Sequence, residues 1–188
     1  MITNKKIDDL IRAFACYQRL FNPDSRLLLV GDYRGQERYL TVLRRLVARL
    51  GVNEVVFTGH VEHDELLAYY GVADLFLCLS EHEGFCVPLV EAMHFGLPVL
   101  AYDAGAVRDT LRGGGMLLRE KTPELVAGLI DRIARDAALR TAVLATQQQA
   151  LAAVRATDFG ALLSERLASV LAARPPASLV PANGGPHA

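Results

Sequence analysis

Residues 75–102, LFLCLSEHEGFCVPLVEAMHFGLPVLAY, contain a strand, a loop, a helix and a second strand, and this unit decides the fold. The run Leu75–Leu79 is short and apolar throughout, which is typical of a strand covered on both faces. Pro88 marks the first turn of a helix that extends to Phe95. A further apolar run, Val99–Tyr102, predicts the next strand. Consecutive strands joined by a helix indicate a parallel sheet with right-handed crossovers.

The same alternation continues in both directions along the chain. Upstream, helical spacing of apolar residues alternates with short apolar runs, at 7–17 (helix), 27–30 (strand), 39–50 (helix), 55–58 (strand) and 64–70 (helix). Downstream follow 106–111 (helix), 116–118 (strand) and then only helices, at 123–136, 138–154 and 159–171. The pattern predicts an α/β fold with a Rossmann-like, doubly wound parallel sheet. Such sheets bind ligands in the loops at the carboxyl ends of their strands.

We expect three regions along the chain. Residues 1–140 form the α/β domain, residues 141–173 form C-terminal helices, and residues 174–188, rich in Pro, Gly and Ala, form a disordered tail. The chain opens with a helix, whereas a fold of this class normally opens with a strand.

Composition excludes several classes of protein. The 188 residues are 52% hydrophobic, which argues against intrinsic disorder, and their formal net charge of -1 offers no basic excess for nucleic acid. No apolar run approaches the roughly 20 residues that span a bilayer, and the N-terminus does not resemble a signal peptide. The three cysteines form no C-x-x-C pair, which is typical of reduced thiols. We therefore expect a cytoplasmic protein.

The loop between Leu79 and Pro88 carries the most chemistry. Pro88 at the helix start leaves backbone amides free, and the positive end of the helix dipole faces the same space, so the loop suits an anion. Glu83 and Glu91 bracket it with seven residues between them. A carboxylate suits the hydroxyls of a sugar or a ribose. Taken singly, Glu91 is also explained as a helix-dipole residue and Glu83 as a solvated loop acid; together they favour a binding role.

The stretch Glu83–Met93, EGFCVPLVEAM, followed by Gly96–Val99, resembles the E-x7-E motif of retaining GT-B glycosyltransferases of family 4, the glycosyl transferases group 1. The resemblance extends over residues 4–140. It implies the C-terminal half of a GT-B fold, lacking its first strand, because family members carry a strand and a basic residue ahead of the lysine that Lys5 matches. It also implies a hexosyltransferase-type enzyme that moves a sugar from a nucleotide-diphosphate sugar to an acceptor with retention.

The resemblance assigns roles to individual residues. Glu83 and Lys5 would be catalytic: Glu83 would contact hydroxyls of the donor sugar, and the charge of Lys5 would stabilise the diphosphate leaving group. Glu91 would bind the ribose hydroxyls. The remaining donor-binding positions would be the backbone of Gly84, Phe85, Cys86 and Val87, the strand-end glycine Gly31, and the nucleobase segment Gly59, His60 and Val61.

This chain departs from the family pattern at two positions in the loops. Cys86 stands where the family usually has glycine, and a left-handed backbone there would be strained. Arg108 stands where proline is common.

No metal site and no cofactor are expected. His60 and His63 have H-x-x-H spacing, but a third ligand is not evident, and the sequence contains no D-x-D. Expected partners are the nucleotide sugar, an acceptor that is a glycan, a lipid or a small molecule, and a missing or separate N-terminal GT-B domain. The protein would be cytoplasmic or peripheral at the inner face of a membrane.

Two other functions remain open. The chain could be a nucleotide-sugar-binding module that is inactive alone and depends on a separate acceptor-domain chain. It could also be a GT-B-like sugar-nucleotide epimerase, which would use carboxylates in the same cleft.

Overall fold

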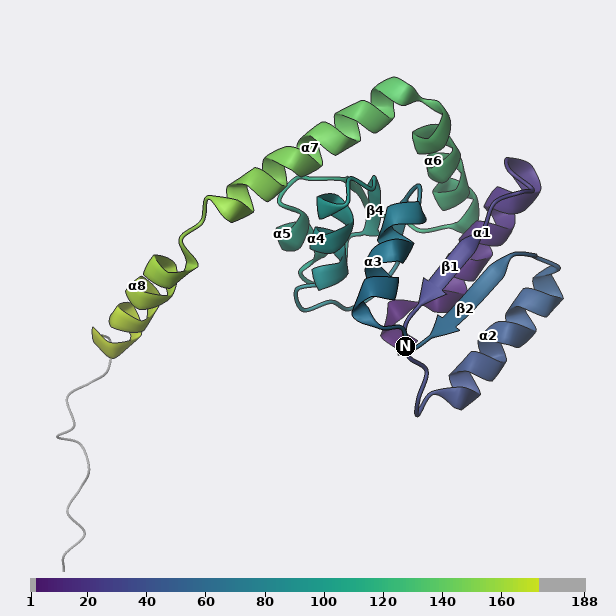
Figure 1. The fold of residues 1–188 in the computed structure, drawn as a ribbon, viewed down its shortest axis with the longest axis horizontal. Helices are drawn as coiled ribbons and strands as arrows, with labels where there is room; N and C mark the ends of the chain where they lie inside the picture. Colours follow the sequence, from purple (N-terminus) through teal and green to yellow (C-terminus); the bar gives the residue numbers. More distant parts are fainter. Residues whose placement is uncertain (1–2, 173–188) are drawn as a thin grey trace, which may run out of the picture. The chain divides into compact units, whose positions relative to one another are not determined.

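The computed structural model describes residues 3–172 and shows helices alternating with parallel strands (Figure 1). In chain order the first elements are η1 (Thr3–Lys5), α1 (Ile7–Leu20), β1 (Leu27–Val30), α2 (Glu37–Leu50), β2 (Val55–Gly59) and α3 (His63–Val72). The others are β3 (Phe76–Cys78), α4 (Val87–His94), β4 (Val99–Tyr102), α5 (Val107–Leu111), β5 (Met116–Leu118), α6 (Pro123–Arg135), α7 (Ala137–Arg155) and α8 (Phe159–Ala172). The helices and strands predicted from the pattern are confirmed, with boundaries that differ by only a few residues.

The strands form two parallel sheets, β1-β2 and β3-β4-β5, and not the one continuous sheet that was expected. Within residues 3–172 no strand precedes α1, so β1 and β3 each pair on one edge only. In Figure 1 the arrowheads of β1 and β2 point toward the N-terminus of the chain, where the site is built.

Both sheets share one hydrophobic core, which is organised around α1. Ile11 and Ala13 of α1 are fully buried, and this helix packs against α2 and α6. Leu29, at β1, and Leu100, in β4, belong to the same buried cluster although they lie in different sheets. The core therefore holds the two sheets together where backbone pairing does not.

Helix α7 is attached to the start of β4 through a buried glutamine. Gln147 is 1% exposed, its Oε1 accepts a hydrogen bond from the Val99 amide at 2.8 Å, and its Nε2 donates to the Leu97 carbonyl at 2.7 Å. Both polar atoms of the amide group are thus satisfied, as burial requires.

The chain divides into two compact units, residues 1–153 and 154–188. The described part of the second unit consists of the end of α7 and of α8, whose Phe159, Leu163 and Val170 are more than half exposed. The tail predicted to be disordered, residues 174–188, lies outside the described residues. In the described part of the chain no helix is both long and apolar enough to cross a bilayer.

Replacing Gln147 by leucine should destabilise the protein by about 1–3 kcal/mol, because two buried backbone groups would lose their partners. Urea unfolding followed by circular dichroism measures this change. The matched control is Gln148→Leu, at an exposed position of the same helix. Equal stability of the two variants would show that Gln147 does not anchor α7.

Candidate functional site

Lys5 and Glu83 form the centre of the site. Lys5, the last residue of η1, donates from Nζ to both carboxylate oxygens of Glu83, at 2.7 and 2.8 Å. The Glu83 side chain is 6% exposed and that of Lys5 is 36% exposed. The structure therefore brings together the two residues for which a catalytic role was expected, and the Lys5 side chain stays partly exposed to solvent.

The environment keeps Glu83 ionised. Burial disfavours its charged form, but hydrogen bonds from Lys5 and Ser80, the charge of Lys5 and a hydrogen bond from Cys86 outweigh burial and lower the pKa of Glu83. The carboxylate is thus a hydrogen-bond acceptor at neutral pH.

The start of the chain also holds the backbone of this loop. The Glu81 amide donates to the Asn4 carbonyl at 2.9 Å, and Asn4 Nδ2 donates to the His82 carbonyl at 3.1 Å. Lys121, between β5 and α6, contacts the same segment: its Nζ lies 2.6 Å from Asp9 Oδ2, 3.0 Å from Glu81 Oε1 and 3.3 Å from the Leu79 carbonyl oxygen. Residues 79–83 are therefore fixed before the loop turns into α4.

The loop after β4 and the helix α5 that follows it donate hydrogen bonds to the backbone carbonyls of Glu83 and Phe85. The Ala106 amide donates to the Glu83 carbonyl at 3.1 Å, and the Thr110 hydroxyl donates to the Phe85 carbonyl. Gly105 has φ 55°, and a Cβ there would lie 2.5 Å from the Glu83 carbonyl oxygen. Only glycine permits this approach.

The beginning of α4 offers unused backbone donors. Within residues 3–172, no acceptor is recorded for the amides of residues 84–87, which sit at the positive end of the helix dipole. Phe85 and Val87 are more than half exposed. Cys86 adopts the left-handed conformation, with φ 59° and ψ 64°, so the strain expected at this cysteine is present. The arrangement suits an anionic group placed against the backbone.

Glu91, one turn into α4, is positioned by a buried tyrosine. The Tyr70 hydroxyl of α3 donates to Glu91 Oε2 at 2.9 Å, and the Tyr70 ring stacks on Phe95 with centroids 5.3 Å apart. Burial, together with the hydrogen bond to Glu91 and its charge, raises the pKa of Tyr70, so the hydroxyl remains a donor. Among residues 3–172, Tyr70 is the hydrogen-bond partner found for the Glu91 carboxylate, and it contacts Oε2 and not Oε1.

A second group of expected residues lies at the ends of β1 and β2. The Gly31 amide donates to the Gly59 carbonyl at 3.3 Å, and the Gly59 amide donates to the Tyr33 hydroxyl at 2.9 Å. His60 is exposed and lies 3.5 Å from Glu62, while Val61 is half-buried. Gly31 and Gly59 are thus brought together, at the other sheet from Glu83 and Glu91.

One set of side chains at the site has the donor atoms of a metal centre. Ligand atoms of Cys78, Glu83 and Cys86, all buried, lie within 4.8 Å of one another among the described residues. Two thiols and a carboxylate are ligands that zinc accepts. Both oxygens of Glu83, however, already accept hydrogen bonds from Lys5, so a cation is present at this carboxylate without a metal.

Comparison with known proteins identifies the family. The model of the glycosyl transferases group 1 matches residues 1–149, and the chain belongs to this family. N-acetyl-alpha-D-glucosaminyl L-malate synthase of Bacillus anthracis is 35% identical over 111 residues, which are 58% of this chain and 27% of that protein. A GDP-mannose-dependent alpha-mannosyltransferase of Mycolicibacterium smegmatis is 40% identical over 86 residues, or 46% and 20% of the two chains. This chain thus matches about a quarter of the length of these relatives.

Solved structures share the fold. Anabaena HepE in complex with UDP and glucose superposes with a TM-score of 0.71 at 27% identity, over 93% of this chain and 46% of that one. The C-terminal domain of a glycosyl transferase group 1 protein from Francisella tularensis gives a TM-score of 0.69 at 23% identity, covering 81% and 80% of the chains. The fold is that of the C-terminal, Rossmann-like domain of GT-B glycosyltransferases.

Sequence reasoning missed the residues that support the site from other elements. Tyr70 and Lys121 give no local signal of their function, because each acts through a contact with a distant segment. The glycine after the Val99–Tyr102 strand was the one detectable sign, since a strand-end glycine in this fold is a candidate for a close approach.

Lys5→Met should raise the pKa of Glu83 and destabilise the protein at neutral pH by about 1–2 kcal/mol, the low end for charge-assisted bonds because Lys5 is partly exposed. A lowered carboxyl pKa contributes stability above its ordinary value of 4.5, and this contribution disappears as the pH falls through the folded value. The variant should therefore differ from wild type at pH 7 and approach it in acid. Urea unfolding at both pH values measures this.

The control is Lys6→Met, because Lys6 lies 3.4 Å from the half-exposed carboxylate of Glu81. A Lys5→Met deficit that is the same in acid and at neutral pH would contradict the account of the Lys5–Glu83 pair.

Proposed function

We propose that this chain is the donor-binding part of a retaining, family 4 glycosyltransferase that transfers a hexose from a nucleotide-diphosphate sugar to an acceptor. The observation that carries the proposal is the Lys5–Glu83 pair at the open start of α4, with Glu91 eight residues further on. A cation, free amides and two carboxylates at one loop are complementary to a diphosphate that joins two hydroxylated sugars.

Each residue has a distinct task in this proposal. The amides of residues 84–87 and the Lys5 ammonium group face the diphosphate, whose negative charge grows as the bond to the sugar breaks. Glu83 accepts hydrogen bonds from the donor sugar and fixes its orientation. Glu91, held by Tyr70, accepts from the ribose hydroxyls. Gly31, Gly59, His60 and Val61 would lie along the nucleoside.

The charge of the diphosphate would be carried by Lys5 and the helix terminus, so the proposal requires no divalent metal. The names of relatives and neighbours support a nucleotide sugar as the donor: one relative is GDP-mannose-dependent, and HepE was solved with UDP-glucose. A thermal-shift screen of UDP-, GDP-, ADP- and TDP-sugars would identify the base, since a bound ligand raises stability by mass action.

A binding module that needs a separate acceptor domain is the second candidate. The chain spans 46% of the length of HepE. A module of this kind would bind the nucleotide sugar and release no nucleotide until an acceptor domain is added. Isomerised nucleotide sugar without an acceptor would instead indicate an epimerase.

Glu91→Ala should weaken binding of the preferred nucleoside diphosphate by about 1–3 kcal/mol, through loss of charged hydrogen bonds. Tyr70→Phe should weaken it less, by about 0.5–1.5 kcal/mol, because the carboxylate remains but is no longer oriented. Calorimetry with UDP and GDP in buffer containing EDTA measures both changes. Glu124→Ala, an exposed acid of α6, is the control; unchanged affinity in Glu91→Ala would remove the ribose assignment.

Glu83→Gln should weaken binding of the sugar part of the donor and not binding of the nucleotide. The affinity for UDP-glucose should fall toward that for UDP alone, whereas UDP itself should bind as well as before or better, because Lys5 is released from the carboxylate. Calorimetric titration of both ligands tests this without an acceptor. Retention of the full difference between UDP-glucose and UDP would exclude Glu83 from the sugar site.

A further inference from the structure

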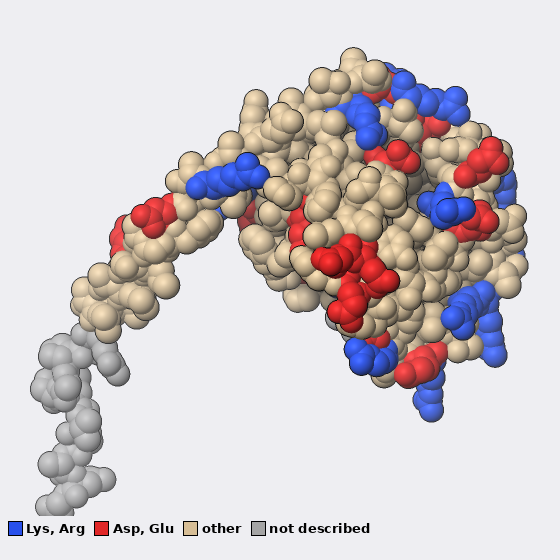
Figure 2. Space-filling view, viewed as in Figure 1, with Lys and Arg blue, Asp and Glu red and all other residues tan. Residues whose placement is uncertain are grey.

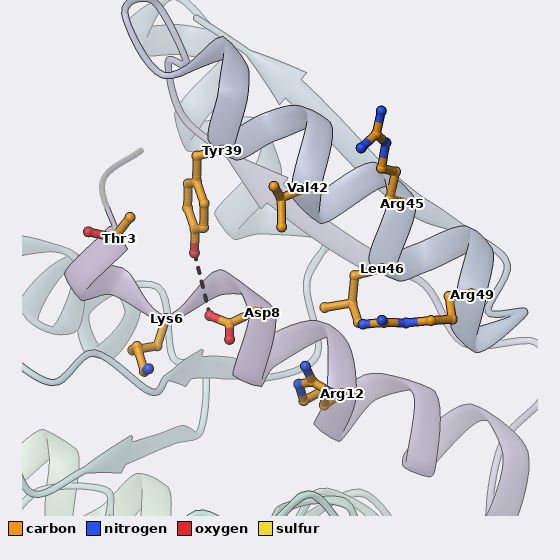
Figure 3. Close-up of a pocket in the computed structure, with 9 residues that line it drawn as sticks. All are labelled: Thr3, Lys6, Asp8, Arg12, Tyr39, Val42, Arg45, Leu46 and Arg49. Atoms are coloured by element: carbon orange, nitrogen blue, oxygen red, sulfur yellow. Dashed lines mark hydrogen bonds between the residues drawn. The ribbon is translucent and has the colours of Figure 1, made fainter.

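A cavity of about 480 Å³ lies between α1 and α2, away from the Glu83–Glu91 loop (Figure 3). None of the residues that line it belongs to the segment 80–93. The charged and hydroxyl-bearing residues that matter to its chemistry are Lys6, Asp8, Arg12, Tyr39, Arg45 and Arg49. We call this the α1–α2 cavity.

Positive charge dominates the α1–α2 cavity. Its lining has four basic side chains and one acidic one, although the whole chain has a net charge of -1. In the part of the chain that the structure describes, Arg12, Arg45 and Arg49 form no ion pair, and Lys6 pairs with Glu81, which lies outside the cavity. Figure 2 shows basic side chains projecting from the edge of the molecule that α2 occupies.

This concentration of charge is unfavourable without a ligand. Arg45 and Arg49 are spaced i and i+4 on α2, where like charges repel. The arginines without an ion-pair partner among the described residues therefore gain most from a shared anion, because guanidinium groups bind phosphate through charge-assisted hydrogen bonds.

The cavity has room and polar groups for a small molecule. In Figure 3 the ring of Tyr39 reaches from α2 toward α1, and its hydroxyl donates to Asp8 Oδ1 at 3.5 Å. Arg12 extends from α1 and Arg49 lies beside Leu46, whereas the side chain of Arg45 points away from α1. The volume falls within the range of about 300–1,000 Å³ that is common for small-molecule sites.

We propose that the α1–α2 cavity is a second anion site, which binds a small molecule carrying two or more phosphate groups. Arg12 and Arg49, which extend from facing helices beside a hollow, favour a compact polyanion over the flat array of single charges on a membrane. The site is separate from the Lys5–Glu83 centre: Lys5 directs its ammonium group to Glu83, whereas the next residue, Lys6, lines the cavity from a left-handed backbone with φ 50°.

The test is calorimetric titration of the full chain with inorganic tripolyphosphate. Arg12→Gln/Arg49→Gln should lower the affinity by at least about tenfold, as expected for two lost charge-assisted contacts. The matched control, Arg38→Gln/Arg44→Gln, removes the same charge from exposed positions of α2 that do not line the cavity, and should change affinity less than about twofold. Equal losses in both double variants would show nonspecific attraction and overturn the proposal.

Two further arms separate this site from the alternatives. Tripolyphosphate bound at the Lys5–Glu83 centre would be a separate binding event, so Lys5→Met should leave in place the binding that depends on Arg12 and Arg49. Loss of that binding in Lys5→Met would put the anion at the Lys5–Glu83 centre and overturn the proposal. Sedimentation with phosphatidylglycerol vesicles tests a membrane. Vesicle binding that depends on Arg12 and Arg49, without tripolyphosphate binding, would assign the surface to lipid and also overturn it. None of these readouts requires that the chain bind a nucleotide sugar.

Discussion

The rest of the site depends on the ion pair between Lys5 and Glu83, which joins residues 78 positions apart in the chain. A carboxylate as buried as that of Glu83 is stable only with its partner, since removing one member of a buried pair leaves an uncompensated charge. The pair also ties the start of α1 to the loop before α4. Asn4, Lys121 and Ala106 then hold the backbone of that loop from three directions, so the amides at the start of α4 are presented in a fixed arrangement.

Much of the fold was predictable because residues that are close together in the sequence specify each strand–helix unit. Apolar runs bounded by turn residues located β4 and β5 to the residue. Helix α2 ends at Leu50, as the range 39–50 predicted, and is followed by Gly51 with φ 62°, whose amide donates to the Ala48 and Val47 carbonyls. The pairing of strands was not predictable. An apolar run shows that a strand exists and not which of its edges finds a partner, so the division into two sheets appears only in three dimensions.

The residues of the candidate site likewise fall into those that a local sequence pattern predicts and those that only the structure reveals. Glu83 and Glu91 stood out through their spacing around a loop, and Lys5 through a resemblance to a family; their roles stay predictions, but their placement is now known. Tyr70, in α3, and Lys121, just before α6, contact the site from segments that are distant in the sequence, and no short motif spans that separation. The α1–α2 cavity was hidden for another reason: a net charge near zero is an average, and it conceals a local gathering of arginines from two helices.

The division of the sheet has a mechanical consequence. Gly31 and Gly59 lie on β1-β2, whereas Glu83 and Glu91 follow β3, and in the described chain no backbone ladder joins the two sheets. The distance between these two sets of loops is therefore set by the side-chain packing around α1 and not by a row of interstrand hydrogen bonds. Packing contacts yield more readily than a continuous ladder. A ligand bound to both halves would therefore cross the line at which side-chain packing, and not backbone pairing, joins the two sheets.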